Sequence, residues 1–216
     1  MSTDLKKENN KSIFSILIAI ILVCTGFQLG FNKLPDLTEA LVAGTASTLF
    51  SAVLVMFTNV LSHNIKHKMI FTRFVDEMPA SRVNKLCIND SRVDFKAVEK
   101  RWPKIFDSVT PSSERNSLWY RHIYKPVKDT NEVRQAHRSF LLYRDVFSGL
   151  VIIFFSTWIW QLLGPSELIG KIVPEVFITL GVSSLLVFIA ARNAGNRFVV
   201  YLTHFNLQGK TSESYH

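Results

Sequence analysis

The chain has 216 residues, of which 48% are hydrophobic, and its formal net charge is +8. Its apolar residues are concentrated in four blocks, at residues 13–31, 40–61, 146–163 and 169–191, with the charged residues between and around them. A soluble domain interleaves apolar and polar residues at a period of 2 or 3.6, and a membrane β-barrel alternates them, so both classes are excluded.

The four blocks have the length of membrane-spanning helices. Roughly 20 apolar residues in a helix cross a hydrocarbon core about 30 Å thick, and a helix satisfies its own backbone there. The sequence therefore predicts an all-α membrane protein with four transmembrane helices. The block at 13–31 is longer than the roughly 7–15 apolar residues of a signal peptide, so we interpret it as a retained helix.

Lys and Arg residues lie almost entirely on one side of the predicted membrane. Of the 25, only Lys33 and Lys171 fall in the short loops after the first and third blocks. The positive-inside rule then predicts that both termini and the segment between the second and third blocks lie in the cytoplasm. Because orientation and attraction to anionic lipid explain the basic charge, we do not expect direct nucleic-acid binding.

Five parts follow in chain order. We expect a cytoplasmic N-terminal tail at 1–11, transmembrane helices one and two at 12–61, and a cytoplasmic helical domain at 62–144 inserted between the second and third spans. Transmembrane helices three and four follow at 145–195, and a cytoplasmic C-terminal tail at 196–216. The ends, at 1–11 and about 207–216, are expected to be disordered, and the second spanning helix to continue past Asn59 until Pro79.

Helix signals organise the segment at 62–144. Residues 81–88 predict a short helix, and Asp90 or Ser91 is a good cap for a second one that Pro103 ends. Thr110 is expected to cap a third helix, with Pro111 at its first position.

Pro126 is expected to stop this third helix. The next one begins near Thr130 and meets no Gly or Pro before Gly149, which predicts that the basic segment and the third apolar block are one continuous helix. The fourth block should also continue past the bilayer, with Phe198, Val199, Leu202 and Phe205 on one stripe.

Basic residues near the predicted membrane surface are candidates for contact with anionic lipid or with a phosphate-rich ligand. They are Lys66, Lys68, Arg73, Arg138, Arg144, Arg192 and Arg197. In the second block, Ala43, Ser47 and Ser51 recur every four residues and form a candidate helix-packing face. We therefore expect a homo-oligomer, a dimer or a tetramer, in the lipid bilayer.

No catalytic, cofactor or metal site is predicted. His63 and His67 share a helix face, but no third ligand stands at metal-binding spacing. Cys87 is expected to be a buried, inert thiol. The interiors of the four blocks lack the ionisable residues that pumps and secondary transporters use, so neither is expected. An enzyme is not expected either, because the sequence has no Gly-rich phosphate loop, no Ser-His-Asp pattern and no Cys cluster.

Three pieces of the chain carry a resemblance: "MPASRVNKLCINDSRVDFKAVEKRW", "WYRHIYKPV" and "LLYRDVFSGL". They resemble a group of small bacterial four-helix inner-membrane proteins with the long loop inside. Proteins of this plan occur as membrane subunits of phage-defence systems, Kiwa among them, which implies a role in antiviral defence.

The leading hypothesis is a self-associating sensor, effector or membrane scaffold that couples a cytoplasmic protein partner or signal to the membrane. An ion channel or pore-forming protein is the alternative, and an enzyme acting on lipid or peptide comes third.

Overall fold

A computed structural model describes residues 2–29, 56, 60–163 and 171–211, and every regular element within these ranges is helical. The three long helices are α1 (Ser2–Leu29), α9 (Asn131–Leu163) and α10 (Pro174–Thr211). The structure has three helical segments long and apolar enough to cross a membrane, within Glu8–Gln28, Asn131–Leu163 and Pro174–Gln208. The block at 40–61 lies outside the described residues, except for residues 56, 60 and 61.

The long helices begin or end at other residues than expected in three places. Residues 2–11 are the first turns of α1 rather than a disordered tail, and α10 remains helical to Thr211. At its other end α10 begins at Pro174, whereas the apolar block begins at residue 169; residues 171–173 are not helical. Proline lacks the N–H that a helix interior needs but fits the first turn, which explains the later start.

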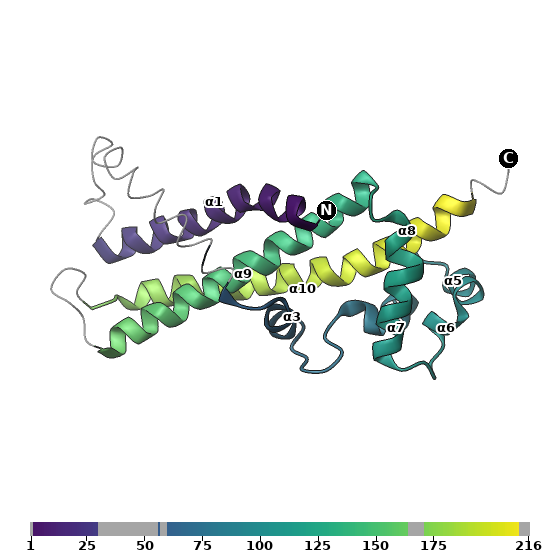
Figure 1. Cartoon of the computed structure of the whole chain (residues 1–216). Helices are drawn as coiled ribbons and strands as arrows, with labels where there is room; N and C mark the ends of the chain where they lie inside the picture. The colour runs from purple at the N-terminus through teal and green to yellow at the C-terminus, as the bar shows by residue number, and fades with distance from the viewer. Residues whose placement is uncertain (1, 30–55, 57–59, 164–170, 212–216) are drawn as a thin grey trace. The chain divides into compact units, whose positions relative to one another are not determined.

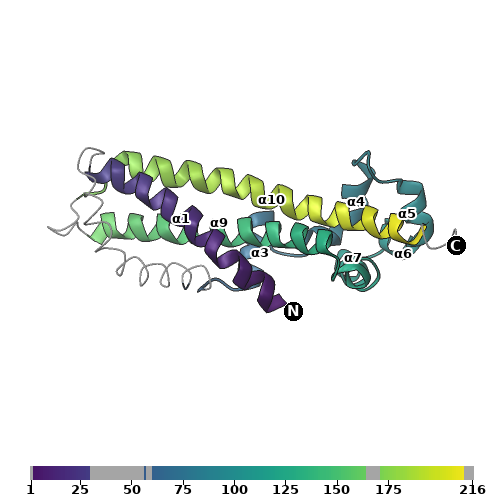
Figure 2. The ribbon, with the colours of Figure 1, turned by 90° about the horizontal axis from the view of Figure 1, so that it is seen from above.

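The chain divides into two compact units. Unit 1 is Met1–Lys66 with Leu141–Ala190, and unit 2 is His67–Phe140 with Ala191–His216. In unit 1, α1 and the apolar parts of α9 and α10 pack around one core (Figures 1 and 2). Its buried residues are Ile13, Leu17, Cys24, Val146, Leu150, Val176 and Leu180. Large apolar side chains such as Trp158 and Leu186 are exposed, as expected of a surface that faces lipid.

Unit 2 contains the short helices: α3 (His63–Phe71, whose first residues belong to unit 1), η2 (Pro79–Arg82), α4 (Val83–Ile88), α5 (Phe95–Arg101), α6 (Pro103–Phe106), α7 (Ser112–Trp119), the π-helical η3 (Tyr120–Tyr124) and α8 (Lys125–Val127). Figure 2 shows α5, α6 and α7 gathered around the C-terminal part of α10. That part contributes Val199, Val200 and Leu202 to the core, and Phe198 and Phe205 pack against it. The predicted stripe is confirmed, and the described part of the expected C-terminal tail, residues 196–211, is helical and belongs to α10.

Several helix starts differ from the expected ones. Leu61 and Ser62 are not helical, and the Ser62 hydroxyl accepts a hydrogen bond from the Ile65 amide, so α3 begins afresh at His63 instead of continuing an earlier helix. Asp94 caps α5 by accepting from the Ala97 amide, since the Asp90 carboxylate is engaged by Arg92. Helix α7 begins one residue later than expected, at Ser112. Residues 79–88 form η2 and α4, close to the predicted short helix.

Pro126 does not stop the helix that contains it. It lies inside α8, directly after the π-helical turn η3. Proline cannot donate to the carbonyl four residues before it, and a π-turn is one way a helix absorbs such a gap. The side chain of Asn206 then donates to the carbonyls of His122 (3.5 Å) and Ile123 (2.8 Å). A residue of α10 thus satisfies the carbonyls beside the proline.

Arg115 organises the loops of unit 2. It is 5% exposed, and its guanidinium donates to four backbone carbonyls. These belong to Ile105 (2.9 Å), Ser81 (3.1 Å), Asp107 (2.7 Å) and Thr110 (2.8 Å). One side chain thereby satisfies carbonyls of the short helices η2 and α6 and of the loop that follows α6.

Candidate functional site

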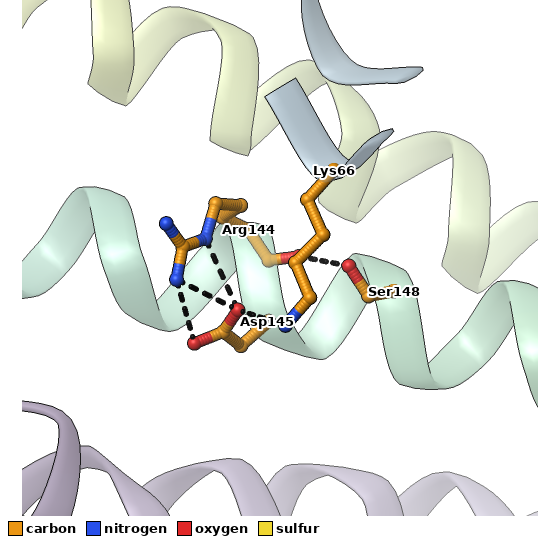
Figure 3. A network of polar contacts seen from close by, with 4 residues as sticks. All are labelled: Lys66, Arg144, Asp145 and Ser148. Carbon is orange, nitrogen blue, oxygen red and sulfur yellow. Dashed lines mark hydrogen bonds and ion pairs between the residues drawn. The ribbon is translucent and has the colours of Figure 1, made fainter. Parts of the chain in front are cut away.

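A buried charge network joins α3 to α9 within unit 1 (Figure 3). The Lys66 ammonium lies 2.8 Å from Oδ1 of Asp145. The Arg144 guanidinium holds both oxygens of the same carboxylate, with Nε donating to Oδ1 and Nη2 to Oδ2 at 3.1 Å each. Lys66, Arg144 and Asp145 are only 1%, 3% and 2% exposed, so two cations share one carboxylate away from water.

Local sequence places these groups. Asp145 is the last charged residue before the apolar run at 146–163, and it sits in the middle of the unbroken helix α9. Ser148, one turn further on, is fully buried, and its hydroxyl donates a hydrogen bond to the Arg144 carbonyl at 2.9 Å. Lys66 comes from the first turn of α3, whose start Ser62 caps. The capped start therefore fixes the position from which Lys66 reaches Asp145.

The network links two helices through buried ion pairs. Separating one partner of a buried ion pair leaves an uncompensated charge and costs roughly 3–5 kcal/mol. Charged side chains at the edge of a membrane span are expensive unless they are paired. The arrangement therefore holds α3 against α9 at the N-terminal edge of the apolar run and resists partial opening.

The candidate contacts for lipid or anionic ligand divide into two groups. Lys66 and Arg144 are buried and contact the Asp145 carboxylate. The other five keep their side chains at least partly accessible. Arg73 and Arg197 are exposed, while Lys68, Arg138 and Arg192 are partly buried. The packing candidates Ala43, Ser47 and Ser51 lie outside the described residues.

The sequence reasoning missed the pairing of Lys66 with Asp145. The two residues are 79 positions apart, and no short-range pattern links them. One signal was available: Asp145 is a carboxylate at the end of a basic flank, directly before the apolar run, where orientation would favour cations.

Two other chemistries have no support in the described residues. No group of three or more His, Cys, Asp or Glu side chains there could hold a metal ion. The Cys87 thiol is buried in unit 2, and burial raises its pKa to about 12, so it is protonated and unreactive at neutral pH.

A small cavity in unit 1 is equally poor in reactive groups. It measures about 300 Å³ and is lined mostly by apolar side chains of α1, α9 and α10, with Gln28 at its edge. The Gln28 amide is occupied by the backbone before α10: it donates to the Lys171 carbonyl and accepts from the Val173 amide. The chain matches no protein-family model, no curated protein and no solved structure, so its function must be inferred from these residues.

Proposed function

We propose that this chain is a multi-pass protein of the bacterial inner membrane that senses a cytoplasmic signal or partner through unit 2 and passes it to its apolar helices. Unit 2 would lie in the cytoplasm and unit 1 in the bilayer. The role in phage defence stays a prediction from the resemblance.

The observation that carries the proposal is the continuity of α9. This single helix of 33 residues contributes its first ten residues to unit 2 and the rest to unit 1. A helix without a break transmits rotation or displacement along its axis, provided that two arrangements of similar energy exist. Helix α10 is shared between the units in the same way, at Ala190 and Ala191.

The buried charge network supports the proposal because it can serve as the element that switches between two states. A buried ion pair is either formed or broken, because intermediate separations leave charges without water or a partner. Arg144 and Asp145 lie within five residues of the point at which α9 passes from unit 2 to unit 1. A displacement of α9 would therefore act first on this network.

The coupling can be tested without knowing the signal. Arg115→Lys keeps the charge but loses most of the guanidinium fork, and so perturbs unit 2. We expect it to change amide hydrogen exchange at residues 141–150 of α9 in the nanodisc-embedded protein. Replacing the exposed Gln135 and Ser139 by glycine should abolish that effect, because each glycine weakens a helix by roughly 1 kcal/mol. The alanine pair at the same positions is the matched control and should transmit normally.

Two outcomes would count against coupling. If Arg115→Lys leaves residues 141–150 unchanged, or if the glycine and alanine pairs transmit equally, α9 does not carry the signal. Ion flux through reconstituted protein that survives the glycine pair would instead support the channel alternative.

The topology has its own test. Reporter fusions at Ser112 and at the C-terminus should both report the cytoplasm, and a fusion at Ser166 should report the outside, as the distribution of Lys and Arg predicts. A periplasmic signal at Ser112 would place unit 2 on the wrong side for this proposal. Self-association remains a prediction: Ser47→Leu should reduce the mass of the detergent-solubilised particle.

A further inference from the structure

Three arginines of unit 2 meet around a buried phenylalanine. Phe71 is fully buried at the end of α3, and the guanidinium of Arg82 lies over its ring, 5.4 Å from the centroid. Arg73 follows two residues after Phe71. Arg192 of α10 joins them, because its Nη1 donates to the Thr72 hydroxyl at 3.4 Å.

Backbone features hold this cluster in place. Gly195 of α10 has no side chain, and a Cβ there would come within 2.6 Å of the Phe71 ring. The glycine therefore lets Phe71 seat directly on the helix. Thr72 adopts a left-handed conformation with a φ of 51°, which is unfavourable for a β-branched residue and recurs at functional sites. Its hydroxyl also donates to the Phe71 carbonyl at 2.8 Å.

The cluster has a hydrogen-bond donor to spare. Arg82 uses Nη2 for a 3.3 Å hydrogen bond to the Asn196 side chain, while its buried Nη1 has no partner. In the described part of the chain, none of Arg73, Arg82 and Arg192 forms an ion pair with a carboxylate. Burial, and then the positive charges of Arg73 and Arg192, lower the pKa of Arg82.

We propose that Arg73, Arg82 and Arg192 form a binding site for a phosphate group. Arginine guanidinium groups bind phosphate oxygens through paired, charge-assisted hydrogen bonds, and a bound anion would supply both the missing acceptor and the missing negative charge. The site goes beyond the proposed function, since it binds phosphate whether or not unit 2 signals to the apolar helices.

The phosphate can come from a lipid headgroup or from a soluble molecule. Phe74 and Val75, the two residues after Arg73, are 85% and 75% exposed. An exposed apolar pair beside an arginine suits the boundary between headgroups and acyl chains. The soluble source is the other arm of the test.

The first arm uses inorganic phosphate and the full chain in neutral detergent. We expect phosphate to raise the thermal midpoint more than chloride at the same ionic strength. Arg82→Met should weaken the apparent phosphate affinity about tenfold or more, which is what one charge-assisted hydrogen bond supplies. Arg73→Met, at an exposed position that tolerates change, should weaken it in the same direction. Arg121→Met removes the same charge from an exposed position elsewhere in unit 2 and should change it less than about twofold.

The second arm places the protein in nanodiscs with and without an anionic phospholipid. If the headgroup is the source, anionic lipid raises the midpoint, added phosphate then has no further effect, and Phe74→Ser reduces the lipid effect but not the phosphate effect in detergent. If the source is soluble, phosphate raises the midpoint equally in both discs. The proposal is overturned if phosphate and chloride act alike in detergent, or if Arg82→Met and Arg121→Met have the same effect.

Discussion

Asp145→Asn is expected to be the most damaging isosteric change in unit 1. The carboxylate accepts from Lys66 at 2.8 Å and from Arg144 at 3.1 Å, and both cations are almost fully buried. The asparagine side chain keeps the shape but removes the negative charge to which both the Lys66 ammonium and the Arg144 guanidinium donate. Removing one partner of a buried ion pair costs roughly 3–5 kcal/mol, so we expect a loss of that size.

Lys66→Met provides the contrast. It leaves the Arg144–Asp145 fork intact and replaces a buried ammonium by an apolar side chain of similar length. The variant loses one charge-assisted hydrogen bond, but it no longer has to bury an ammonium group on folding. Because these two effects partly cancel, we expect the free energy of unfolding to fall by about 1 kcal/mol. The double variant should be more stable than the sum of the two single changes predicts, because the contact between the Lys66 ammonium and the Asp145 carboxylate can be lost only once.

The assay is reversible unfolding in mixed micelles, followed by far-ultraviolet circular dichroism. A coupling energy between the two changes of more than about 1 kcal/mol would confirm that Lys66 and Asp145 interact directly. If the two effects add to within about 0.5 kcal/mol, or if Lys66→Met costs as much as Asp145→Asn, the shared-carboxylate reasoning is wrong.

Other positions give simpler tests. Arg115→Met should destabilise unit 2 by about 2–5 kcal/mol, measured by hydrogen exchange of its core, because it leaves buried carbonyls unpaired. A loss below about 0.5 kcal/mol, the size typical of a surface substitution, would contradict this. Gly195→Ala should cost about 1–3 kcal/mol in thermal unfolding, because its Cβ would press against the rings of Phe71 and Phe140. Gly181→Ala on the same helix is the control: its Cβ would meet no described neighbour within 4 Å, so this change should be neutral or stabilising. Because its pKa is raised, Cys87 should stay unlabelled by maleimide at pH 8 in folded protein and react only after denaturation; rapid labelling would mean that it is accessible.

The continuity of α9 could be predicted from the sequence because its signals are local. Asn131 follows a good capping residue, and no Gly or Pro interrupts the run before Gly149. Local signals were less reliable at Asp90, where a carboxylate that could have capped a helix pairs with Arg92 instead. An aspartate that caps a helix cannot be told from one that pairs with a nearby arginine when the sequence offers both the helix start and the arginine within a few residues.

The charge network and the arginine cluster could not be predicted, because both depend on distant contacts. The sequence gives no reason to single out Arg82, whose contacts with Phe71 and Asn196 arise only in the fold. Lys66 was predicted as one of the basic residues near the membrane surface, whereas its partner, Asp145, follows 79 residues later. Composition correctly indicated where charge accumulates, but only tertiary packing decides which charges are buried and paired.

The order of synthesis has a consequence for how unit 2 forms. Val199, Val200 and Leu202 belong to its core, yet they follow residues 141–190, which contribute to unit 1. Asn206 is later still, and it satisfies the carbonyls beside Pro126. Residues 67–140 therefore leave the ribosome without the partners that complete their core and must wait while both later apolar helices are made. The core of unit 2 can therefore be completed only after the C-terminal part of α10 has been synthesised, so its folding is delayed relative to the synthesis of residues 67–140.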